Sequence, residues 1–163
     1  MIPKPTGRMI SVQGGRDLVL ERTFRAPIED VWASITESDR SARWIASWAG
    51  EPGPGKSILV QMTAEEGAAP EPVLITACEP PRHLALNWTV GESAWKIEVS
   101  LSESEGTTTL TFVHHIQPEE DASDIGPGWE YYLDRLVADR DGEPFAAWDE
   151  YYPAQKEHYA TAV

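Results

Sequence analysis

The sequence predicts an α+β domain in which a curved antiparallel sheet is covered by one long helix near the C-terminus. Three observations predict it: a strand followed by two short helices between residues 18 and 44, five alternating segments between 57 and 116, and an amphipathic segment that begins near Trp129. A sheet with one apolar face needs an apolar cover, and the segment near Trp129 has the matching face. The helix should therefore lie across the concave side of the sheet and leave a cavity between them, all within one domain spanning 1–163.

The opening of the chain alternates as a strand over LVLERTF, residues 18–24, and breaks at Pro27. Apolar residues then recur at helical spacing, namely Ile28, Val31, Trp32 and Ile35. They predict a helix with Pro27 at its first position, where the missing N–H costs nothing. A second short helix is predicted from Ser38 to Trp44, with Ser38 as its N-cap. Residues 1–15 lack the apolar stretch of a signal peptide and are expected to form a mobile lead-in with room for a short strand.

Five further strands are predicted after a Gly/Pro-rich turn at residues 50–55. They are Ser57–Met62, Pro72–Cys78, His83–Thr89, Ala94–Ser102 and Thr107–Ile116. Each alternates apolar and polar side chains, and turn residues at Gly91 and Gly106 separate the last three. Repeated period-two alternation with short turns is typical of an antiparallel meander with one wet face.

The C-terminal third is predicted to hold an acidic loop, a long helix and a packed tail. The loop should run from Gln117 to Pro127. The helix that follows has the apolar stripe Trp129, Tyr132, Leu133, Leu136 and Val137, and Asp141-Gly142 supplies its stop signal. The tail, 143–163, is too aromatic for a solvated linker, so we expect it to pack on the domain, with helices over 144–150 and after Pro153. It could seal one end of the cavity or form the contact of a homodimer.

Two segments resemble a known family. LVLERTFRAPIEDVWASITESDRSARW (18–44) and GWEYYLDRL (128–136) resemble the Hsp90-ATPase-activator-like family, part of the SRPBCC superfamily of START-like and Bet v 1-like helix-grip proteins. The resemblance covers about 18–142 and implies a sheet wrapped around the C-terminal helix. It implies three alternative functions, because this fold supports many: binding of a small molecule, a polyketide cyclase-like enzyme, or a stress-related or chaperone-associated interaction module. Hsp90 activation is not implied, because the resemblance reaches only the C-terminal part of that multidomain co-chaperone.

The inward residues of the predicted strands and helix should line a cavity for a small apolar or aromatic molecule. The candidate lining residues are Trp44, Leu86, Trp88, Trp95, Ile97, Leu110, Phe112, His114, Trp129, Tyr132, Leu133 and Leu136. The alternative is that the aromatic residues, among them the seven tryptophans of the chain, simply fill the core.

His114 shares a strand face with Leu110 and Phe112, so its imidazole should point inward. It is either a buried neutral ring bonded to a backbone carbonyl or a tyrosine hydroxyl, or a polar anchor in the cavity. In the cyclase-like alternative it would be the acid/base group, with Tyr131 or Tyr132 as a second polar group. Burial should lower its pKa unless a carboxylate accompanies it. The paired acids at 65–66 and 119–121 are expected to be solvated.

Composition and spacing exclude several classes of function. The formal charge of −14 argues against binding to nucleic acid or to an anionic membrane, and no apolar run has the length of a membrane span. His114 and His115 are strand neighbours that diverge, and no phosphate-binding or dinucleotide motif is present, so we expect no metal, no cofactor and no assigned catalytic residue. Cys78 is the one cysteine, which fits a cytoplasmic protein.

Overall fold

The computed structural model describes residues 4–65, 67–90 and 93–161. Eight strands form one antiparallel sheet with the order β1-β2-β8-β7-β6-β5-β4-β3. The strands are β1 (Arg8–Val12), β2 (Gly15–Phe24), β3 (Ala46–Ala49), β4 (Ser57–Met62), β5 (Glu71–Glu79), β6 (His83–Val90), β7 (Ser93–Ser104) and β8 (Thr107–Ile116). The helices are α1 (Ile28–Thr36), α2 (Ser38–Ser41), α3 (Ala122–Asp141), the 3-10 turn η1 (Trp148–Glu150) and α4 (Lys156–Thr161).

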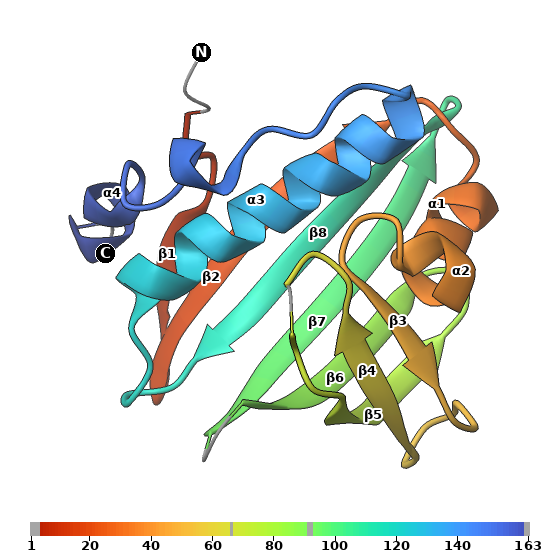
Figure 1. Ribbon diagram of the computed structural model, residues 1–163, viewed down its shortest axis with the longest axis horizontal. Helices are drawn as coiled ribbons and strands as arrows, with labels where there is room; N and C mark the ends of the chain where they lie inside the picture. The colour runs from red at the N-terminus through yellow and green to blue at the C-terminus, as the bar shows by residue number, and fades with distance from the viewer. Residues whose placement is uncertain (1–3, 66, 91–92, 162–163) are drawn as a thin grey trace.

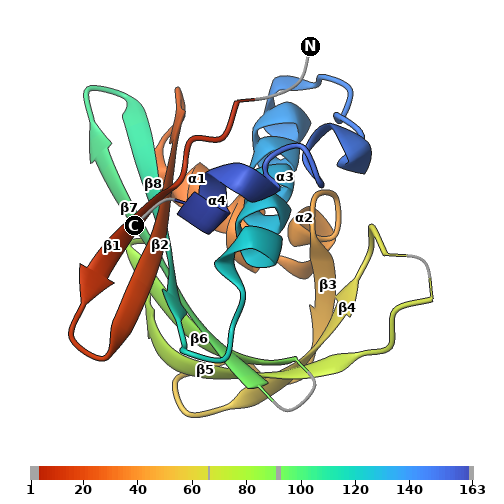
Figure 2. The same ribbon diagram turned by 90° about the vertical axis from the view of Figure 1, so that its left-hand side faces the viewer.

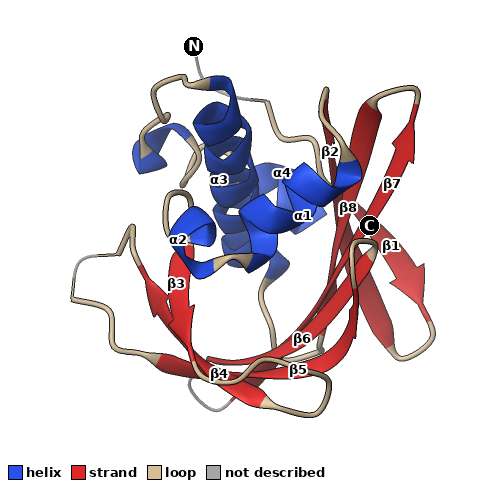
Figure 3. Ribbon diagram, turned by 90° about the vertical axis from the view of Figure 1, so that its right-hand side faces the viewer, coloured by secondary structure: helices blue, strands red, loops and turns tan. Residues whose placement is uncertain are grey.

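The sheet curves around α3, as predicted (Figures 1 and 2). In Figure 2 the strands form a trough with β7 and β8 on one side, β5 and β6 at its base and β3 and β4 on the other side, and α3 lies in its opening. Helices α1 and α2 lie on the same concave side, where α1 contacts β7 and β8 and α2 contacts β3 (Figure 3). This is the helix-grip arrangement, with the core between α3 and the inner face of the sheet.

The five strands predicted between residues 57 and 116 are confirmed as β4 to β8, although the predicted turn at Gly91 lies outside the described residues. β8 shows why the pattern is informative, because every second side chain is buried from Thr108 to Ile116. The sequence analysis missed β3. This strand has four residues and is defined by its pairing with β4, from Ala46 opposite Met62 to Ala49 opposite Leu59. A strand this short shows too little alternation to be recognised.

The roles predicted for Pro27 and Ser38 at the helix starts are wrong, and the second helix ends at Ser41 and not at Trp44. α1 begins at Ile28, so Pro27 is the residue before the helix and not its first residue. Ser38 lies inside α2 and does not cap it. Its hydroxyl instead accepts a bond from the backbone N–H of Trp48 (2.8 Å) and donates to the Trp48 carbonyl (2.9 Å), so it holds α2 against β3.

Helix α3 begins at Ala122, inside the segment predicted as a loop. The Asp121 carboxylate caps it by accepting from the backbone N–H of Ser123 at 2.9 Å. Pro127 is accommodated early in the helix, and Gly142 ends it in the left-handed conformation (φ 69°), as the stop signal predicted.

The C-terminal tail contacts α3 through both buried and partly exposed aromatic side chains, since Trp148 packs on Tyr131 and Phe145 lies against Arg135. Tyr151 and Tyr159 are buried, whereas Phe145 and Trp148 are more than one-third exposed. Only Trp148–Glu150 is helical within the helix predicted over 144–150, and α4 follows Pro153. At the other end of the chain, residues 8–12 form β1, which pairs with β2.

The Tyr159 ring packs against α3 at a position where the helix has a glycine. A Cβ atom at Gly126 would lie 2.4 Å from the Tyr159 ring, whereas a Cβ atom at Gly128 would meet no described atom within 4 Å. Gly126→Ala should therefore displace Tyr159 and cost about 1–3 kcal/mol. Gly128→Ala should stabilise the protein by about 0.5–1 kcal/mol, because alanine favours a helix.

Urea unfolding of the two variants, with limited proteolysis between Asp141 and Pro153, measures this difference. We expect faster cleavage in Gly126→Ala and unchanged cleavage in Gly128→Ala. Equal stability of the two alanine variants would show that Tyr159 does not need the space at Gly126.

Candidate functional site

A cavity of about 170 Å³ lies between the sheet and α3, and its walls are almost entirely apolar. Eight predicted residues line it: Trp44, Leu86, Trp88, Ile97, Leu110, Phe112, Trp129 and Leu133. Several other lining residues were not predicted, among them Ile35, Trp48, Val60, Ile75, Cys78 and Leu84. The alternation of β4 and β5 was the signal for Val60 and Ile75. We call this space the inner cavity.

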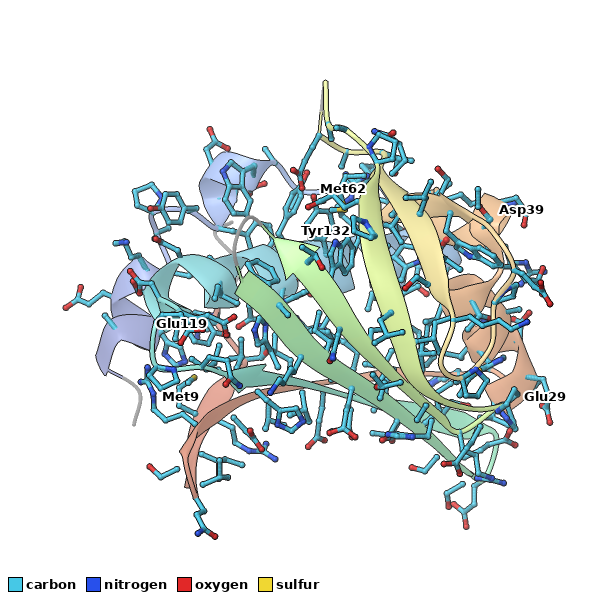
Figure 4. The ribbon with its side chains drawn as sticks, turned by 90° about the horizontal axis from the view of Figure 1, so that it is seen from below. Met9, Glu29, Asp39, Met62, Glu119 and Tyr132 are labelled. Atoms are coloured by element: carbon cyan, nitrogen blue, oxygen red, sulfur yellow. The ribbon has the colours of Figure 1, made fainter. Side chains whose placement is uncertain are left out.

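A second, larger space of about 650 Å³ is lined by the first half of α3 and by residues at the end of β4. We call it the outer groove. Four predicted residues line it: Trp88, Trp95, Trp129 and Tyr132. Figure 4 shows Tyr132 of α3 beside Met62 of β4, two elements that meet at this groove. Tyr131, which the sequence analysis considered only as a polar group of the cyclase-like alternative, also lines it. Trp148 and the carboxylates of Glu65, Glu71 and Asp124 are further lining residues that were not predicted.

Trp88 and Trp129 line both spaces and therefore form the partition between them. Their rings meet edge to face at a centroid distance of 6.5 Å, and Trp129 also packs on Phe112 at 4.5 Å. The buried indole N–H of Trp88 has no hydrogen-bond partner within the described part of the chain. A buried donor without a partner is costly, and this one belongs to a residue that lines both spaces.

His114 is fully buried and lines neither space. Its Nδ1 accepts a hydrogen bond from the Trp129 indole N–H at 3.1 Å, and its Nε2 lies 3.2 Å from the Glu120 carboxylate. Because Nδ1 accepts, Nε2 is the protonated nitrogen and donates to Glu120. Burial holds the pKa of His114 below its usual value, although the Glu120 carboxylate opposes that shift. The imidazole thus orients Trp129.

The remaining predictions are mixed. Leu136 is fully buried in the core and lines neither space. The expectation that residues 119–121 are solvated is wrong for Glu120, whose side chain is only 3 % exposed, because it follows β8 closely enough to reach His114. Glu65 is exposed and accepts a bond from the Tyr132 hydroxyl at 2.7 Å, which links the residues just after β4 to α3. Burial and this carboxylate raise the pKa of Tyr132.

No group of three or more His, Cys, Asp or Glu side chains in 4–65, 67–90 and 93–161 is placed to hold a metal ion. None of the helices in the same ranges combines the length and apolar character that crossing a membrane requires.

The family model described as "Activator of Hsp90 ATPase homolog 1-like protein" matches residues 25–138, from the end of β2 to within α3. The chain belongs to this family. Among solved structures, this family member is similar to CalU16 from Micromonospora echinospora, with 26 % identity over 98 % of this chain and 96 % of that chain, and a TM-score of 0.76. It is also similar to the protein encoded by gene BPP1335 from Bordetella parapertussis, with 26 % identity over 99 % and 92 % of the two chains and a TM-score of 0.77.

A more distant similarity shows the fold alone. This chain matches DynU16, described as a putative protein in the dynemicin biosynthetic locus, with 21 % identity and a TM-score of 0.67. The match covers 78 % of this chain and 48 % of that one. No curated protein matches this chain.

Proposed function

We propose that this protein binds a small apolar or aromatic molecule between the sheet and α3. The observation that carries the proposal is the inner cavity, an apolar space of about 170 Å³ within the core. Apolar cavities of about 150 Å³ can hold a molecule the size of benzene, so a pocket of this volume has room for a small aromatic molecule.

Trp88 refines the kind of molecule that would fit. Its buried N–H has no partner in the described ranges, and the residue lines both the inner cavity and the outer groove. An unpaired buried donor costs about 1–3 kcal/mol, which a ligand oxygen at the partition would recover. An aromatic molecule with a carbonyl, ether or phenolic oxygen therefore fits better than a pure hydrocarbon.

The cyclase-like alternative has weaker support. Acid/base catalysis needs polar groups within hydrogen-bond reach of the substrate. His114 and Glu120 form a hydrogen-bonded pair of this chemical kind, but neither residue lines the inner cavity or the outer groove. Binding without chemical change is the function that the geometry supports best.

A cavity-filling substitution tests the proposal. Leu110 is buried and lines the inner cavity, so Leu110→Trp should fill it. Calorimetric titration with tert-butylbenzene, a neutral aromatic probe, should give saturable binding to the wild type and at least about tenfold weaker binding to this variant, a change of about 1.4 kcal/mol. Leu59→Trp is the matched control, because Leu59 is 53 % exposed and lines neither space.

A second variant protects the test against misfolding. Cys78 also lines the inner cavity and is only partly buried, so Cys78→Phe should reduce its volume with less strain on the core. Undiminished probe binding to folded Leu110→Trp and Cys78→Phe would place the site elsewhere.

A further inference from the structure

The outer groove differs from the inner cavity in its chemistry. Its walls combine a set of aromatic side chains with carboxylates: Trp88, Trp95, Trp129, Tyr131, Tyr132 and Trp148, together with Glu65, Glu71 and Asp124. No lysine, arginine or histidine is among its described lining residues. Aromatic rings present a negative face to a cation, so both kinds of group in this groove attract positive charge.

The aromatic side chains are held in place by one another. Tyr131 packs edge to face on Tyr132 at 5.1 Å and on Trp148 at 5.2 Å, and Trp148 stacks on Tyr152 at 5.6 Å with an interplanar angle of 9°. Trp148 is nonetheless 43 % exposed, so one of its sides remains open at the rim of the groove. These contacts give the rim a fixed shape.

The nearby cations leave two carboxylates without an ionic partner. Lys156 lies 2.5 Å from Asp124 and compensates its charge. Arg135 does not line the groove; it donates to the Trp44 carbonyl at 2.8 Å, and its guanidinium lies 5.4 Å from the centroid of the Tyr131 ring, so it forms no ion pair with a carboxylate of the groove. Glu65 and Glu71 form no ion pair with any residue of the ranges described, and the hydrogen bond that Glu65 accepts from the Tyr132 hydroxyl comes from a neutral donor. The groove therefore has uncompensated negative charge beside its aromatic walls.

We infer that the outer groove binds the positively charged ammonium group of an organic cation, with the aromatic walls and Glu65 and Glu71 facing the charge. The inference rests on the proposed function for the rest of the ligand, whose aromatic or apolar body extends toward the partition at Trp88 and Trp129. The ligand class is thus an aromatic amine or quaternary ammonium compound. An anionic aromatic compound of the same size is rejected, because it would meet the same two carboxylates.

Two probes of equal shape separate the contribution of charge to the binding affinity from the contribution of apolar contact. Trimethylphenylammonium and tert-butylbenzene have the same outline, but only the first is charged. Calorimetric titration of the wild type at low salt should show the cation binding at least about tenfold more tightly than the neutral probe, and added salt should reduce this difference.

Substitution of the two carboxylates tests their role. Glu65→Gln with Glu71→Gln removes both charges while leaving an oxygen at position 65 that can accept the Tyr132 hydroxyl, and it should abolish the preference for the cation without changing the affinity for tert-butylbenzene. The matched control is Glu29→Gln with Asp39→Asn, which removes the same charge from two exposed residues that Figure 4 shows well away from Tyr132. The control should keep the preference.

The outcomes separate the two proposals. Equal affinities for the two probes, or a preference that survives in Glu65→Gln/Glu71→Gln, would overturn the cation site while leaving the proposed function in place. Absence of any binding by trimethylphenylammonium would also overturn the cation site. Unchanged binding of tert-butylbenzene to Leu110→Trp would instead overturn the proposed function.

Discussion

Replacing Glu130 with alanine is expected to lower the free energy of unfolding by about 3–5 kcal/mol, the largest effect of any single substitution considered. Glu130 is 1 % exposed and accepts hydrogen bonds from Thr6, Gly7, Tyr159 and Arg22. The Arg22 side chain is only 10 % exposed, so loss of the carboxylate leaves a nearly buried guanidinium with fewer partners. The same loss removes the hydrogen bonds by which Thr6, Gly7 and Tyr159 are tied to α3 through this carboxylate.

Urea unfolding measures this cost, and an exposed glutamate supplies the control. Glu119→Ala removes a carboxylate of the same type from an exposed position and should change the free energy of unfolding by no more than about 0.5 kcal/mol. A cost below about 1 kcal/mol for Glu130→Ala would mean that the buried cluster contributes little to stability.

The same carboxylate should make stability depend on pH. Burial alone would raise the pKa of Glu130, but the hydrogen bonds from Tyr159, Thr6, Gly7 and Arg22 outweigh it and hold the pKa below its usual value. Because the folded pKa is the lower one, the stabilisation is fully present above the unfolded value, about 4.3, and is lost as the pH falls through the folded pKa. The stability difference between the wild type and Glu130→Gln should therefore narrow in acid.

Truncation of the apolar stripe on α3 should have the second largest effect. Leu136 is fully buried in the core between α3 and the sheet, so Leu136→Ala should cost about 2–5 kcal/mol in urea unfolding. Leu59→Ala makes the same truncation at a side chain that is 53 % exposed, and it should cost less than about 1 kcal/mol.

Leu133→Ala adds a second readout to this experiment. Leu133 belongs to the same stripe but also lines the inner cavity, so its truncation should both destabilise the protein and enlarge the cavity. Costs below about 1 kcal/mol at both Leu133 and Leu136 would show that the stripe does not face the core.

The regular elements could be predicted because each strand from β4 to β8 keeps one face on the core, so burial imposes a period of two on the sequence. The first turns of α3 were missed for a physical reason. Gly126, Pro127 and Gly128 are typical of a turn, but Gly126 accommodates the ring of Tyr159, which lies 33 positions further along the chain. A contact that distant leaves no local pattern.

The candidate site could be predicted only in part. Alternation placed Leu110, Phe112 and His114 on one strand face, and all three are buried. It could not show that Trp129 and Trp88 divide the space in two, because the division depends on side-chain orientation, and the orientation of Trp129 depends on its bond to His114. The carboxylates of the outer groove were missed because Glu65 and Asp124 are far apart in sequence and line one groove only in the folded chain.

The shared wall between the two spaces makes them thermodynamically dependent on each other. A guest in the outer groove that pushes the Trp129 ring inward reduces the volume of the inner cavity, since the same ring bounds both. The affinity of a second guest for the inner cavity then falls, and linkage requires that the second guest weaken the first by the same factor. Two small molecules would thus compete without touching, whereas one elongated molecule that replaces part of the wall would occupy both spaces at once.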